Sequence, residues 1–160
     1  MKLSEAVKFY AENHFAVLPA VYGDKRPSVD WKEYQDEAPS EKQVKAWFKG
    51  KKEQNIAVIC GEPSANLVVI DFDDMAVYPQ FFNTQEIESA TIVVKTGSGK
   101  RHVYLRSEKP AASFKIPQLK IEARAGLSLN YVLKYVGEVA LSGLPIFSAA
   151  SLVRIRLSML

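Results

Sequence analysis

Two aspartates, Asp71 and Asp73, stand one residue apart at the end of an apolar run that begins at Leu67. Side chains alternate between the two faces of a strand, so both carboxylates are predicted to point the same way, while Ile70 and Phe72 point into the core. Two such charges repel each other across roughly 7 Å, and Mg²⁺ or Mn²⁺ would remove that repulsion. The alternative is a strand end with solvated acids, and the spacing alone does not decide between the two.

A second run, residues 96 to 106, alternates polar and apolar residues. Lys100 and His102 share one predicted strand face, whereas Leu105 favours the core. The small residues around Ser98 would let backbone N–H groups approach a phosphate closely. The alternative is an exposed hairpin with solvated basic residues. The spacing excludes a Walker A loop, because no Gly-Lys-Ser/Thr sequence follows a glycine at the required distance.

The third run places Glu122 and Arg124 on one face of a predicted strand, with Ile121 and Ala123 opposite. Taken alone, these two charges favour a structural ion pair. If the three strands are neighbours in one sheet, however, three carboxylates and one histidine converge on one surface. Such a set suits two-metal phosphoryl transfer, with basic residues beside it to bind the triphosphate and the nucleic-acid backbone.

The pattern predicts one α+β domain over residues 1–160 that positions these groups. Ser4 is the predicted N-cap of a helix over about residues 4 to 13, and Ser40 with Gln43 forms a capping box for a second helix that Gly50 ends. Residues 74–88 are ambiguous and could be helical after Pro79. Strands are expected at 15–19, 55–60, 67–73, 91–95, 101–106, 119–124 and 131–136.

The composition is that of an ordinary soluble protein, with 160 residues, 48% hydrophobic residues and a net charge of +3. This mildly basic balance permits a polyanionic partner. The lone cysteine, Cys60, excludes an internal disulfide. No signal peptide or membrane span is visible, so the expected location is the cytoplasm and no membrane partner is expected.

The order of these motifs resembles the N-terminal domain of bifunctional DNA primase-polymerases, in the archaeo-eukaryotic primase superfamily. The likeness covers about residues 5–126. Val69–Asp73 resembles motif I of the family, Ser98–His102 resembles motif II and Ile121–Arg124 resembles motif III. The other matching pieces are His14–Pro19, Lys25–Pro27, Trp31–Gln35, Trp47–Phe48 and Asn55–Gly61.

The resemblance implies an RRM-like catalytic sheet with an N-terminal α/β unit. It implies that Asp71, Asp73 and Glu122 coordinate Mg²⁺ or Mn²⁺. It also implies that His102 contacts the phosphates of the nucleotide, supported by Ser98 and Lys100, with Arg124 as a secondary partner. The expected substrates are a DNA template or primer and dNTP or NTP, and a replicative helicase is a further expected partner.

After Gly126 the sequence departs from the family pattern, because the expected Pro-Pro-Ser segment is missing. Residues 127–160 are therefore an atypical tail, which indicates an unusual ending, a truncation or a reading-frame change. A domain shortened in this way is expected to be catalytically weak or inactive. A C-terminal helix from about Phe147 that packs on the sheet is the alternative.

Two other functions remain open from the residues. A glycosyltransferase would explain Asp71 and Asp73 as ligands of a metal and a nucleotide-sugar, but it leaves His102 and Glu122 without a shared purpose. A non-catalytic replication accessory protein would bind single-stranded DNA through the basic face. Stacking aromatic side chains would favour it, and Tyr104 with Tyr131 are the only candidates.

Overall fold

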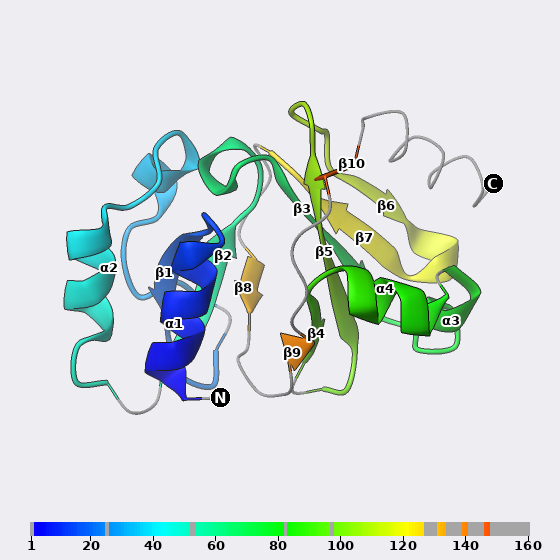
Figure 1. Ribbon diagram of the computed structural model, residues 1–160, viewed down its shortest axis with the longest axis horizontal. Helices are drawn as coiled ribbons and strands as arrows, with labels where there is room; N and C mark the ends of the chain where they lie inside the picture. Colours follow the sequence, from blue (N-terminus) through cyan, green and yellow to red (C-terminus); the bar gives the residue numbers. More distant parts are fainter. Residues whose placement is uncertain are drawn as a thin grey trace.

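The chain forms two units side by side, as the computed structural model in Figure 1 shows. The structure describes residues 2–24, 26–51, 54–81, 83–96, 98–126, 131–133, 139–140 and 146–147. Helices and antiparallel sheets are mixed in both units, which confirms the α+β class. The helices are α1 (Leu3–Glu12), α2 (Glu41–Phe48), α3 (Tyr78–Phe81) and α4 (Thr84–Ala90), with 3₁₀ turns η1 (Lys32–Gln35), η2 (Glu62–Ser64) and η3 (Pro117–Leu119). The strands are β1 (Ala16–Ala20), β2 (Asn55–Ile59), β3 (Leu67–Phe72), β4 (Val93–Lys95), β5 (Arg101–Ser107), β6 (Phe114–Ile116), β7 (Ile121–Arg124), β8 (Tyr131–Leu133), β9 (Val139–Ala140) and β10 (Ile146–Phe147).

The N-terminal unit consists of α1, α2 and a three-stranded sheet in the order β1-β2-β8. The predicted N-cap Ser4 is wrong, because α1 begins at Leu3 and the Glu5 carboxylate accepts from the backbone N–H of Lys2 at 2.8 Å. The predicted capping box of α2 is confirmed, since the backbone N–H of Gln43 donates to the Ser40 hydroxyl at 3.3 Å and the Ser40 N–H donates to the Gln43 side chain at 2.9 Å. The expected α/β unit is therefore present.

The larger sheet has the order β6-β7-β3-β5-β4-β9, and β10 pairs with β5. The ambiguous stretch after β3 forms α3 and α4, which pack on one face of this sheet. Three strands begin later than predicted. β1 starts at Ala16 and β4 at Val93, while β7 starts at Ile121 because Leu119 ends η3 and Lys120 adopts a left-handed backbone with φ of 51°. The RRM-like detail is not confirmed, because the chain forms β6 and η3 between β5 and β7 rather than a second crossover helix.

The larger sheet is buried on both faces, and β3 contributes alternate residues to each. Val68, Ile70 and Phe72 join the core beneath α3 and α4. Leu67 and Val69 pack instead with residues of α1, β1 and β2. One face of the sheet therefore looks toward the N-terminal unit, and this is the face on which Asp71 lies, because side chains two residues apart share a face.

Tyr104 of β5 is fully buried on that same face, so it does not offer a surface for base stacking. Its ring stacks on Phe15, with centroids 5.6 Å apart and planes at 22°, and Tyr10 lies on it at 6.5 Å. The N-terminal unit covers this part of the sheet, and the prediction of Tyr104 as a stacking residue is wrong. The side chain of Tyr131, the other candidate, lies outside the described residues.

Two expectations concern the end of the chain, and a third concerns membrane spans. The strand predicted from Tyr131 is confirmed for Tyr131–Leu133, which pair with β2, and residues 134–136 lie outside the described part. The predicted helix does not start at Phe147, because Phe147 belongs to β10, and residues 148–160 lie outside the described part. No helix within the described ranges is long and apolar enough to cross a membrane.

Candidate functional site

Asp71, Glu122 and His102 lie in one row across three adjacent strands, which is called the acidic row below. Asp71 of β3 is in register with His102 of β5 on one side and with Glu122 of β7 on the other. Residues opposite each other on neighbouring antiparallel strands have Cα atoms roughly 4.5–5.5 Å apart. The expectation that these three strands are neighbours is therefore confirmed, and their polar side chains share the face turned toward the N-terminal unit.

The Asp71–His102 pair is the most buried part of this row. His102 Nε2 lies 3.4 Å from Asp71 Oδ1, and the two side chains are 8% and 14% exposed. A carboxylate so removed from water needs a compensating cation or hydrogen-bond donor, because an unpaired buried charge is strongly unfavourable. In this structure the imidazole of His102 is one such neighbour.

Glu122 contacts two cations through one oxygen. Its Oε1 lies 2.6 Å from Arg124 Nη2 and 2.7 Å from Lys115 Nζ. Arg124 stands two residues further along the same face of β7, opposite Val69 of β3. The ion pair expected between Glu122 and Arg124 is therefore present.

Lys115 was missed by the sequence analysis, because residues 114–116 were not predicted as a strand. It lies on β6 directly opposite Glu122. The signal available in the sequence was the alternation of Phe114 and Ile116 with Lys115, which places the two apolar side chains on the opposite face. Three residues before a proline are too short a run to stand out from a loop.

Asp73 lies just beyond the end of β3, where its backbone N–H donates to the carbonyl oxygen of Lys120 at 3.0 Å. Its carboxylate accepts a hydrogen bond from the Lys100 ammonium, which comes from the connection between β4 and β5. This hydrogen bond raises the pKa of Lys100 above its ordinary value, and the charges of Asp73 and Asp71 raise it further. Both aspartates are therefore close enough to act on the same lysine.

The connection from β4 to β5 is the tight turn that the sequence predicted. The backbone N–H of Gly99 donates to the Thr96 carbonyl at 2.9 Å, and Gly99 takes a φ of 83°, which glycine adopts readily. Ser98 is exposed on this turn, with its hydroxyl 3.0 Å from that of Thr96. Of the predicted site residues, Ser98 is the one that joins none of the ion pairs described above.

The donor set has the chemistry of a Mg²⁺ or Mn²⁺ site, since hard carboxylate oxygens are what these ions prefer. Among the described residues, no group of three or more His, Cys, Asp or Glu side chains is arranged closely enough to hold a metal ion. Each carboxylate contacts a cationic or titratable nitrogen of the protein instead. The residue types fit a metal, whereas the side-chain positions are those of a charge-balanced, ion-paired site.

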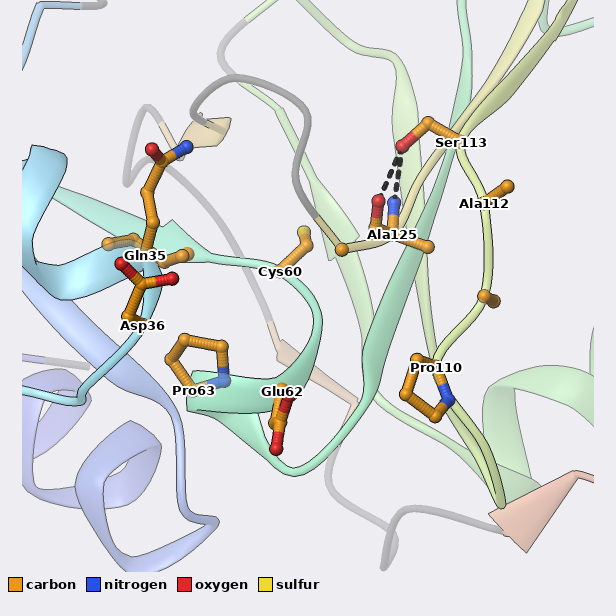
Figure 2. A pocket seen from close by; sticks show the side chains of 12 residues that line it. Gln35, Asp36, Cys60, Glu62, Pro63, Pro110, Ala112, Ser113 and Ala125 are labelled. Carbon is orange, nitrogen blue, oxygen red and sulfur yellow. Dashed lines mark hydrogen bonds between the residues drawn. The ribbon is translucent and has the colours of Figure 1, made fainter.

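A cavity of about 730 Å³ lies between the two units and is distinct from this row. Figure 2 shows Cys60 and Pro63 on one side and Pro110 with Ala112 on the other, while the Ser113 hydroxyl is hydrogen-bonded to the backbone of Ala125. Among the described residues, the cavity is lined by the carboxylates of Asp36 and Glu62 and by no Lys, Arg or His, so this lining does not suit a phosphate. The residues lining it are Gln35, Asp36, Ile59, Cys60, Glu62, Pro63, Pro110, Ala111, Ala112, Ser113, Ala125 and Gly126.

Cys60 lines this cavity, and its burial raises the pKa of the thiol from 9.0 to about 12. The positive charge of Arg124 acts in the opposite direction, but its effect is smaller. The thiol is therefore protonated and a poor nucleophile at neutral pH. Arg124, which pairs with Glu122, is therefore close enough to Cys60 for its charge to act on the thiol.

The sequence was compared with models of known protein families. The family model described as "bifunctional DNA primase/polymerase, N-terminal" matches residues 7–140, a range that contains every predicted site residue. The match continues past Gly126, where the sequence analysis had placed the end of the likeness. No match was found among curated proteins. The match spans most of the chain, and the chain belongs to the family of bifunctional DNA primase/polymerase N-terminal domains.

Proposed function

We propose that this domain joins nucleotides on a DNA template by metal-dependent nucleotidyl transfer, starting or extending a strand. The family implies DNA primase or polymerase function. The single observation that carries the finer proposal is the register of Glu122, Asp71 and His102 across β7, β3 and β5. Two carboxylates directly opposite each other repel, so a structure that keeps them together gains from a cation between them.

In this proposal Asp71, Asp73 and Glu122 hold Mg²⁺ or Mn²⁺. The bound ions would stabilise the charge on the attacking and leaving oxygens of the phosphoryl group. His102 lies beside Asp71, where it can donate a hydrogen bond to a phosphate oxygen of dNTP or NTP. Ser98, exposed on the turn, supports the same phosphates.

The ion pairs suggest how the site would receive its substrate. Lys100 is held by Asp73 and Arg124 by Glu122. A metal that takes these carboxylates leaves the two cations available for the triphosphate or the DNA backbone, which they bind by charge-assisted hydrogen bonds. A replicative helicase that opens the template is a further proposed partner.

A second candidate is a non-catalytic nucleic-acid-binding accessory protein. The observation that favours it is that each acid already contacts a cationic or titratable nitrogen of the protein, as structural ion pairs do. The buried position of Tyr104 argues against it, because binding of single-stranded DNA usually relies on exposed stacking rings.

The test is incorporation of labelled dNTP and NTP on primed and unprimed templates with Mn²⁺ or Mg²⁺, comparing the native protein with Asp71→Asn and Asp74→Asn. Asp74 is the matched control: it lies one residue beyond Asp73 but pairs with Lys120, at 3.6 Å. We expect Asp71→Asn to lose incorporation at least about 100-fold, as removal of a metal ligand does, and Asp74→Asn to resemble the native protein.

Equal incorporation by native protein and Asp71→Asn would refute the metal site. Absence of incorporation by all three proteins, together with DNA binding that weakens steeply with salt, would favour the accessory function instead.

A further inference from the structure

Lys115 reaches the acidic row from β6, a strand that carries none of the three family motifs. It stands opposite Glu122 in the β6–β7 pairing, and its ammonium lies 2.7 Å from Glu122 Oε1. We propose that Lys115 is a positioning residue that holds Glu122 in the metal-free domain and is displaced from it when a divalent cation binds. This inference rests on the proposed function, in which Glu122 is a metal ligand.

The two cations on Glu122 differ in how firmly they are held. The Arg124 side chain is 21% exposed and comes from the same strand as Glu122, between β6 and β3. The Lys115 side chain is 65% exposed and belongs to β6, the edge strand of the sheet. An exposed lysine pays little desolvation to enter the pair and loses little on leaving it, so Lys115 is the cation that gives way.

The position of Lys115 also explains why Glu122 and Asp71 tolerate each other without a metal. The two carboxylates are directly opposite across β3 and β7, an arrangement that is destabilising for like charges. The ammonium approaches Glu122 from the side away from Asp71, because β6 lies beyond β7 in the sheet. It therefore draws the glutamate charge away from the aspartate, and a divalent cation between the two acids must compete with that attraction.

The experiment measures the dissociation constant of Mn²⁺ for the metal-free protein, from the electron paramagnetic resonance signal of free Mn²⁺. The variants are Lys115→Met, Lys115→Arg and Lys120→Met. Lys120 is the matched control, since it is 66% exposed and pairs with Asp74 outside the row. Thermal unfolding of each variant checks that the fold is unchanged.

We expect Lys115→Met to bind Mn²⁺ about two- to fivefold more tightly than the native protein, the factor that an exposed ion pair is worth. Lys115→Arg, which keeps the charge, and Lys120→Met, which removes a charge elsewhere, should both bind like the native protein. An equal affinity in Lys115→Met and native protein, or an equal gain in Lys120→Met, overturns the role of Lys115 while leaving the metal site intact. Failure of every variant and of the native protein to bind Mn²⁺ overturns the proposed metal site itself, and this inference with it.

Discussion

The turn between β2 and β3 passes so close to the end of β7 that it accepts only glycine at residue 61. Gly61 has φ of 85° and ψ of −149°, and it is tied to Leu67 by two backbone hydrogen bonds of 2.8 and 3.2 Å. A Cβ atom added to Gly61 would lie 2.4 Å from Cα and 2.6 Å from the backbone nitrogen of Gly126. Neither backbone segment can move aside easily, because the added Cβ would meet backbone atoms and not the end of a flexible side chain. Gly61→Ala should therefore disturb the packing of the two units.

The magnitude follows from two separate costs. Backbone angles close to those of Gly61 are open almost to glycine alone and cost other residues about 1–3 kcal/mol. Overpacking against a fixed neighbour adds about 1–3 kcal/mol. Gly99→Ala is the matched control, since Gly99 has φ of 83° but no atom of the described residues lies within 4 Å of its added Cβ. We expect about 3 kcal/mol or more for Gly61→Ala and about 1–2 kcal/mol for Gly99→Ala, whose strain is that of the left-handed region.

The assay is urea unfolding followed by tryptophan fluorescence and circular dichroism, with the free energy of unfolding extrapolated to water. A loss of 3 kcal/mol corresponds to a melting temperature lower by roughly 6–12 °C for a chain of this size. If Gly61→Ala is no less stable than Gly99→Ala, the close approach of residue 61 to Gly126 is refuted, and the position of β7 relative to the N-terminal unit must be revised.

Two further predictions concern the buried side chains around the site. Because burial raises the pKa of the Cys60 thiol from 9.0 to about 12, the native protein should resist Ellman's reagent at pH 8 and react fully in urea. The unfolded thiol ionises above pH 9 while the folded one stays protonated. The free energy of unfolding of the native protein, relative to that of Cys60→Ala, should therefore fall by about 1 kcal/mol between pH 9 and pH 10. The same pH dependence in both proteins would refute the burial of the thiol. Tyr104→Leu should cost about 1–3 kcal/mol in urea unfolding through the lost ring stacking, whereas Tyr22→Leu, at a residue that is 64% exposed, should cost less than about 0.5 kcal/mol; equal losses would contradict the stacked core.

Alternation along single strands could be predicted from the sequence, because it depends only on the period of two. The pattern placed Asp71, His102 and Glu122 each on the polar face of its own strand, and the structure confirms that these faces coincide. The register between strands is different, since it depends on packing that no local pattern records. A slip of two residues between β3 and β7 would keep every face unchanged yet bring Arg124 opposite Asp71 in place of Glu122.

The burial of Tyr104 could not be predicted from its own strand for a related reason. Lys100, just before β5, and His102 and Tyr104 on it alternate in the sequence as residues of one polar face would. The N-terminal unit covers the inner part of this face, so that Tyr104 is fully buried while Lys100 remains partly exposed. Nothing in residues 100–106 indicates where that cover begins, because it is supplied by residues some ninety positions earlier, among them Phe15.

The same cover gives the candidate site a gradient of exposure that bears on how the site would work. At the outer end the side chains of Asp73 and Lys100 are 49% and 39% exposed, whereas those of Asp71 and His102, further in, are 14% and 8% exposed. Partner exchange at the outer pair therefore costs about 0–1 kcal/mol, while leaving a charge unpaired at the inner pair costs several kcal/mol. In the proposed metal site, Asp71 would therefore hold its cation where water is already scarce and electrostatic attraction is strongest.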